Sequence, residues 1–137
     1  MSYYNIVDKV ANMLIADKFC NQTGVSSSVG KISYGRYLKT NDGRFALGIW
    51  FDWATWQSDK KSSSPFWMSI QPILDKGEWG ASAHFKQPLE AEGYVYSEWL
   101  VKGKKIAYTP LCAAAGVGEY ELVKNIAGQV KRILSVL

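Results

Sequence analysis

The sequence has few of the residues on which covalent and metal chemistry usually depends. Its 137 residues include two cysteines, Cys20 and Cys112, and a single histidine, His84. Two isolated cysteines cannot build a disulfide framework, so free thiols in a reducing compartment are expected. A structural zinc site takes about four Cys or His ligands, more than these scattered residues supply. We therefore expect no disulfide, no metal and no cofactor.

Long apolar runs and blocks of one charge are also missing. No stretch approaches the ~20 apolar residues that span a bilayer, and no apolar run follows a basic segment at the N-terminus. A cytoplasmic protein without membrane contact is therefore expected. Lys and Arg number 16 and Asp and Glu number 12, which gives a net charge of +4. This excess is spread along the chain, and a dedicated basic tail or acidic block is excluded.

Residue patterns typical of enzymes are absent from the sequence. The lone His84 is accompanied by no G-x-S-x-G nucleophile elbow, which argues against hydrolysis by an activated serine. Glu78 is not followed by the lysine that a magnesium-dependent nuclease would place two residues later. The glycine-containing run 116–118 precedes a helix, but Glu119 and Glu121 would repel a phosphate there. We therefore expect no enzymatic activity.

The composition is that of a globular domain, 47% hydrophobic and 20% charged. Apolar residues recur at helical spacing near both ends of the chain. The two stripes are Tyr3, Val7, Val10 and Leu14 at the start, and Val123, Ile126, Val130, Ile133 and Leu137 at the end. Each stripe predicts a helix that buries one face against a sheet.

Between these helices the apolar period changes to two, which is typical of strands. Strands are predicted at 32–39, 45–51, 66–71, 78–86, 93–101 and 105–109, with a helical turn at 89–92 as an alternative. Asn41-Asp42-Gly43 predicts a tight hairpin turn. Residues 21–28 have the composition of a loop, and 52–65 are predicted to form a short helical turn followed by a loop. The sequence thus predicts one α+β domain over residues 1–137: an antiparallel sheet of about five strands flanked by N-terminal and C-terminal helices.

The unusual feature is the aromatic content, 14% of the chain. Four tryptophans lie close together in the sequence: Trp50, Trp53, Trp56 and Trp67. Trp50 alternates with Ile49 and Phe51, so it must face away from the apolar side of its strand. Rings on that second face could pack inside the domain, form a contact surface for a protein, or stack on nucleobases.

Two lysines follow this group of tryptophans in the sequence. The residues expected to bind a partner are therefore Trp50, Trp53, Trp56, Lys60, Lys61 and Trp67. A protein partner is expected first, because a net charge of +4 without clustered arginines is a weak electrostatic footprint for a nucleic-acid binder. Nucleic-acid binding by the Trp- and Lys-rich loop surface is the alternative.

Several segments resemble a pattern found in uncharacterised bacterial proteins. The pattern is a strand of the type WIGIWFD followed by a strand of the type sPFWLxI. The first strand is similar to FALGIWFDWATW at 45–56, and the second is similar to SPFWMSI at 64–70. The run KIAYTPL at 105–111 and the glutamates at the start of the last helix fit the same pattern. The resemblance covers residues 44–137 and implies an accessory α+β domain of nuclease-like or phage-defence proteins. The expected function is a non-enzymatic intracellular protein-binding module in such a system.

Overall fold

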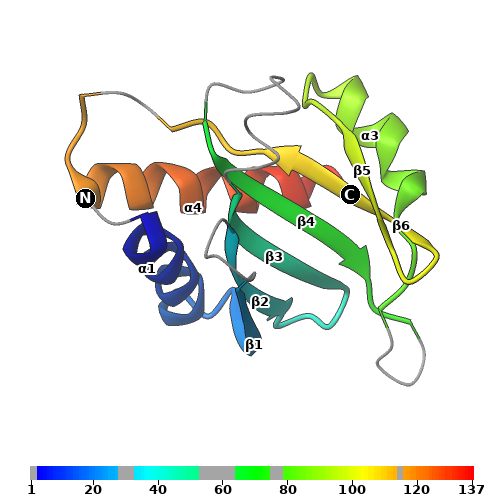
Figure 1. Cartoon of the computed structure of the whole chain (residues 1–137), viewed down its shortest axis with the longest axis horizontal. Coiled ribbons are helices and arrows are strands. Elements are labelled where there is room, and N and C mark those ends of the chain that lie inside the picture. The colour runs from blue at the N-terminus through cyan, green and yellow to red at the C-terminus, as the bar shows by residue number, and fades with distance from the viewer. Residues whose placement is uncertain (1–2, 28–32, 53–63, 75–78, 114–115) are drawn as a thin grey trace.

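The computed structural model describes residues 3–27, 33–52, 64–74, 79–113 and 116–137, and in 25–27 the backbone alone (Figure 1). The helices are α1 (Tyr3–Ala16), the 3₁₀ helix η3 (Ala83–Phe85), α3 (Lys86–Ala91) and α4 (Glu119–Ser135). The strands are β1 (Cys20–Ser27), β2 (Ser33–Thr40), β3 (Phe45–Asp52), β4 (Phe66–Pro72), β5 (Ser97–Val101) and β6 (Lys104–Pro110). They form one six-stranded sheet in the order β1-β2-β3-β4-β6-β5, antiparallel throughout. The predicted α+β class and the two terminal helices are confirmed.

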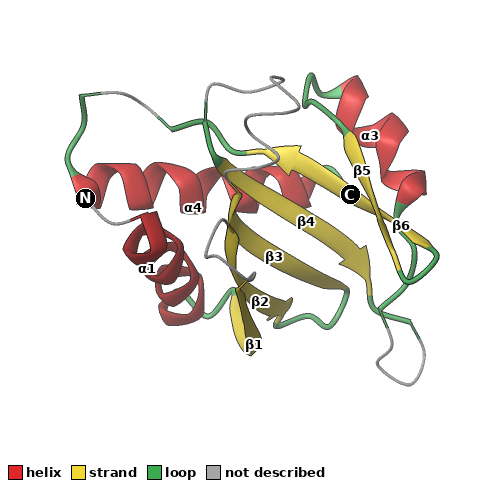
Figure 2. Cartoon of the chain, viewed as in Figure 1, coloured by secondary structure: helices red, strands yellow, loops and turns green. Residues whose placement is uncertain are grey.

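The main apolar core lies between one face of this sheet and the helices, mostly α1 and α4, with Phe85 of η3 and Leu89 of α3. Figure 2 shows α4 crossing behind β4. From α4, the side chains of Val123, Ile126, Val130 and Ile133 are at most 3% exposed, so the predicted stripe is core. Ile49 and its same-face neighbours on the central strands meet these side chains from the sheet. Burying this much apolar surface on one side is the principal source of stability for a sheet with helices at both chain ends.

The hairpin of β2 and β3 forms where the sequence predicted it. Gly43 takes a φ of +75°, a conformation that glycine adopts without steric cost. The hydroxyl of Thr40 accepts a hydrogen bond from the Phe45 N–H at 3.0 Å and donates to the Asp42 carboxylate at 2.7 Å. These bonds fix the turn, and with it the register that sets which side chains of β2 and β3 share a face.

The expectation of a loop at 21–28 was wrong, because these residues supply most of β1. This edge strand pairs with β2 from Cys20 opposite Thr40 to Ser27 opposite Tyr34. Its described side chains after Cys20 are largely exposed. Backbone hydrogen bonds rather than an apolar face hold such a strand, so it carries no alternating signal.

The expectation of a strand at 78–86 was also wrong. In this region η3 and α3 follow one another, and Phe85 and Leu89 are buried at the helical spacing of four. The strand prediction depended on Ala81 and Ala83, and alanine is the best helix former. The helical alternative at 89–92 is closer to the structure, because α3 continues to Ala91.

Candidate functional site

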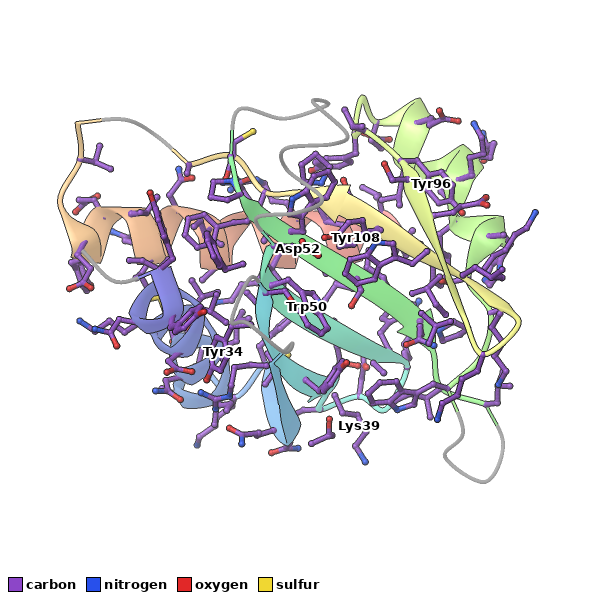
Figure 3. The ribbon with its side chains drawn as sticks, viewed as in Figure 1. Tyr34, Lys39, Trp50, Asp52, Tyr96 and Tyr108 are labelled. Carbon is purple, nitrogen blue, oxygen red and sulfur yellow. The ribbon has the colours of Figure 1, made fainter. Side chains whose placement is uncertain are left out.

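The sheet face opposite α1 and α4 carries a layer of aromatic side chains. Strand register places Trp50 beside Trp67, and Tyr37 and Tyr108 on either side of the Gly48–Ser69 pair. Figure 3 shows Trp50 and Tyr108 on the side of the sheet away from α4. In the described ranges, the cluster on this face contains no helix residue. We call the rings of Tyr37, Trp50, Trp67, Trp79, Trp99 and Tyr108 the aromatic layer.

Two glycines make room for the central ring of the aromatic layer. Trp50 lies across Gly35 on β2 and Gly48 on its own strand, and a Cβ at either position would lie well inside van der Waals contact with the indole. The indole N–H donates to Ser69 Oγ at 3.1 Å, and 8% of Trp50 is exposed. The absence of two side chains therefore lets one large ring lie flat on the sheet.

The six rings touch one another in an unbroken series across the sheet. Trp67 stacks on Tyr108 with centroids 4.5 Å apart and planes 9° apart, and Tyr108 stacks on Trp99 at 3.7 Å. Edge-to-face contacts then join Trp99 to Trp50 at 5.6 Å and Trp50 to Tyr37 at 5.4 Å. Tyr37 finally meets Trp79 at 5.4 Å. Such pairs add about 0.5–1.5 kcal/mol each beyond the area that they bury.

The rings of the aromatic layer differ in exposure. Trp67 and Tyr108 are buried, with 0% and 1% exposed, whereas Tyr37, Trp79 and Trp99 are half-buried. The indole N–H of Trp67 meets no acceptor in the part of the chain that the structure describes. The layer therefore has a packed middle, and its half-buried rings lie at the Tyr37–Trp79 end and at the β5 edge.

Charged groups lie at opposite ends of the aromatic layer. Asp52, which is 8% exposed, accepts a hydrogen bond from the Tyr108 hydroxyl at 3.5 Å where β3 ends. At the other end Lys39 is exposed and follows Tyr37 on the same face of β2 (Figure 3). Lys104 is also exposed, and its Nζ donates to the Trp79 carbonyl at 3.0 Å. The half-buried rings of Tyr37 and Trp79 are thus accompanied by two cations.

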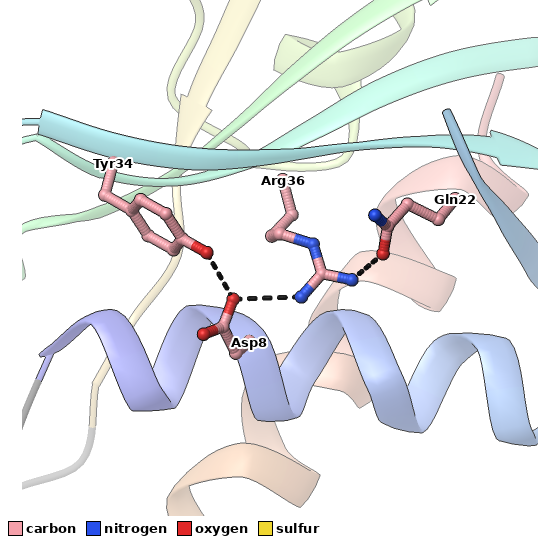
Figure 4. A network of polar contacts seen from close by, with 4 residues as sticks. All are labelled: Asp8, Gln22, Tyr34 and Arg36. Atoms are coloured by element: carbon pink, nitrogen blue, oxygen red, sulfur yellow. Dashed lines mark hydrogen bonds and ion pairs between the residues drawn. The ribbon is translucent and has the colours of Figure 1, made fainter. Parts of the chain in front are cut away.

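A second polar cluster lies on the helical side of the sheet, between α1 and the strands β1 and β2 (Figure 4). The Asp8 carboxylate accepts hydrogen bonds from the Tyr34 hydroxyl at 2.5 Å and from Arg36 Nη1 at 2.9 Å. Arg36 also donates to Gln22 Oε1. Burial, and then the bond to Asp8, raises the pKa of Tyr34. Because Arg36 is 8% exposed and its charge must be paired, this cluster joins α1 to the sheet.

The six residues predicted to bind a partner separate into two groups. Trp50 and Trp67 are buried within the aromatic layer and contact other rings. Trp53, Trp56, Lys60 and Lys61 lie outside the described residues. The described residues that flank them meet one another, since the Asp52 N–H donates to the Pro65 carbonyl at 2.9 Å, and the Asp52 carboxylate accepts a hydrogen bond from Tyr108 of the aromatic layer.

Sequence reasoning missed four members of the aromatic layer. Trp99 and Tyr108 come from segments far from Trp50 in the sequence, and their proximity depends on the strand order. Trp79 lies outside the named strands and reaches the layer through its contact with Tyr37. Tyr37 could have been found, because the predicted turn at Asn41-Asp42-Gly43 sets the hairpin register that places Tyr37 opposite Gly48.

The two cysteines differ in environment. Cys20 is buried, and burial raises the pKa of its thiol to about 12, whereas Cys112 is exposed. Within the described ranges, no three His, Cys, Asp or Glu side chains are grouped so that they could hold a metal ion. No helix there is both long enough and apolar enough to cross a membrane.

Comparison with protein-family models, curated proteins and solved structures finds no match to this chain.

Proposed function

We propose that this chain is a non-enzymatic protein-binding module that contacts its partner with the Tyr37–Trp79 end of the aromatic layer. The observation that carries the proposal is a pair of half-buried rings on a sheet face that is free of helices in the described ranges. Tyr37 is held against Trp50, which is itself fixed on two glycines. Rigid aromatic side chains lose little entropy on binding, and they are enriched at the energetic centres of interfaces.

The charges beside these rings indicate the chemistry of the partner. Lys39 and Lys104 are exposed next to Tyr37 and Trp79, and the Asp52 carboxylate lies at the other end of β3. A partner that presents apolar side chains surrounded by carboxylates would match this pattern of charge. Complementary charges at the rim of an interface favour the encounter rate and the choice of partner more than the final affinity.

Single-stranded nucleic acid is a second candidate partner. Half-buried rings with lysines on a helix-free sheet face are an arrangement that can stack unpaired bases. Two features favour a protein instead. Tyr108 is enclosed between Trp67 and Trp99, so its ring faces are already occupied. The described part of this end carries two lysines, whereas a polyanion is usually held by a longer row of cations.

The proposal is tested by using the whole chain as bait in cell extract, with and without nuclease treatment. Lys39→Glu reverses one charge beside the rings, and Lys124→Glu is the matched control because Lys124 is exposed on α4. We expect the chain to capture a protein whose binding survives nuclease treatment. The Lys124→Glu bait should still capture this protein, and the Lys39→Glu bait should not. If capture of the partner is lost with both variants, or with neither, the proposed surface is wrong. If capture disappears after nuclease treatment, the partner is a nucleic acid or is held through one. The resemblance of residues 44–137 to accessory domains of phage-defence proteins makes components of such systems the first partners to test.

A further inference from the structure

The strand β5 lies at one edge of the sheet. It is the last strand in the order and pairs with β6 along one side. Leu100 is 74% exposed and Val101 is 46% exposed, although both are apolar. Proteins usually protect such edges with proline, lysine or a bulge, but Glu98 is the sole charged residue of β5, and its pairing with β6 is regular.

The hairpin turn determines which backbone groups of β5 point outward. Lys102 and Gly103 have φ values of 50° and 80°, as in a two-residue type I′ turn. The pair that closes such a turn, Val101 with Lys104, is a hydrogen-bonded pair. Hydrogen-bonded pairs alternate along an antiparallel ladder, so the N–H and C=O of Glu98 and Leu100 point away from β6. Within the described ranges, no backbone hydrogen bond from a turn or loop reaches these groups.

We propose that β5 pairs antiparallel with β5 of a second copy of this chain, about a two-fold axis at Trp99. This register places Glu98 opposite Leu100 of the second copy, and Leu100 opposite Glu98. Every outward N–H and C=O of the two residues then forms a hydrogen bond with the other copy. Trp99 then lies opposite Trp99 at a position without hydrogen bonds, where opposing side chains approach most closely. The aromatic layers of the two copies become continuous.

The side chains of β5 favour a second copy as the occupant of this edge. Glu98 faces Leu100 in this register, so the two like charges are not placed directly opposite one another. The two Leu100 side chains become diagonal neighbours on the other face of the sheet, which covers the most exposed large apolar residue of the described chain. The interface is isologous and closes as a dimer. It leaves the Tyr37–Trp79 end free, so this inference does not depend on the proposed function.

Light scattering after size exclusion tests the proposal over a series of protein concentrations. We expect the wild-type chain to approach twice the monomer mass, and Leu100→Glu to remain monomeric because it places a carboxylate directly opposite Glu98 of the other copy, on both sides of the two-fold axis. Leu100→Pro should also be monomeric, since it removes an outward N–H and leaves the bonds to β6 intact. Tyr120→Glu is the matched control, because Tyr120 is 68% exposed on α4, and it should still dimerise. The circular dichroism spectrum of each variant should match that of the wild-type chain, which checks that the variant is folded.

The register is tested by cross-linking in a Cys112→Ser background. Ser97 and Val101 of the two copies lie opposite one another in the proposed pairing, and within one strand they are about 13 Å apart, too far for a disulfide. A mixture of Ser97→Cys and Val101→Cys chains should form a disulfide-linked dimer, and neither variant alone should do so. A wild-type chain that is monomeric at every concentration, dimers that survive both Leu100 substitutions, or cross-linking in a single variant would overturn the proposal.

Discussion

Replacing Gly35 by alanine should destabilise the domain because the new methyl group meets the Trp50 ring. A Cβ at Gly35 would lie against three atoms of the indole, closer than real Cβ atoms approach a neighbour. The ring cannot easily move aside, since its N–H is bonded to Ser69 and its edge contacts Tyr37. Forcing a methyl group into a packed site of this kind typically costs about 1–3 kcal/mol.

A double-mutant cycle separates this clash from a general effect of alanine at Gly35. Trp50→Ala alone should lower the free energy of unfolding by about 3–5 kcal/mol, as loss of a large buried ring does. In that background Gly35→Ala should cost nothing, and it should even stabilise by about 0.4–1 kcal/mol, because alanine restricts the unfolded chain. The coupling energy is the difference between the two costs of Gly35→Ala, about 1.4–4 kcal/mol, and a value of this size is expected for residues in direct contact.

Urea unfolding followed by circular dichroism measures all four free energies of the cycle. Gly24→Ala is the control, because a Cβ there would meet the Tyr37 ring at 3.7 Å, an ordinary contact. This substitution should cost little in either background. An equal cost of Gly35→Ala with and without the Trp50 ring would refute the reasoning, since the penalty would then not come from the indole.

Three further predictions concern the helical side of the sheet. Ile126→Ala should lower the free energy of unfolding by about 2–5 kcal/mol because Ile126 is fully buried, and a loss below about 0.5 kcal/mol in urea unfolding would mean that α4 is poorly packed. Asp8→Ala should cost about 2 kcal/mol because it leaves the buried Arg36 charge without its carboxylate, and an unchanged melting temperature would show that water replaces Asp8. Burial raises the pKa of the Cys20 thiol from 9.0 to about 12, so the folded chain retains a proton that the unfolded chain releases. Stability should therefore fall as pH rises from 9.0 towards 12, and this fall should be smaller in Cys20→Ala when unfolding is measured across that pH range.

Local patterns in the sequence predicted the elements whose structure depends on residues close together in the chain. The hairpin of β2 and β3 follows from alternation and from a turn that needs a positive φ at Gly43. The buried face of α4 follows from apolar residues at helical spacing. By contrast, β1 is a largely polar edge strand, and α3 follows an alanine-containing stretch that suits strand and helix alike. Tertiary context decides such segments, because their own side chains favour neither structure strongly.

The candidate site was predictable in part for the same reason. Alternation along β3 predicted that Trp50 faces away from the helices, and the structure places Trp50 on that opposite face of the sheet. Alternation did not show that Trp99 would pack against this ring or that Tyr108 would stack between Trp67 and Trp99, since β6 lies between β4 and β5 and brings distant segments together. A strand order that follows from long-range pairing carries no short-range signature in the sequence.

Indole N–H signals in NMR spectra test the central claim, that the Tyr37–Trp79 end of the aromatic layer binds a protein. The chain is labelled on its tryptophan indole nitrogens, and the captured partner is added stepwise. The Trp79 signal should shift or broaden strongly, while the signal of Trp67, which is buried in the middle of the layer, should change little. An unchanged Trp79 signal at saturating partner would contradict the account.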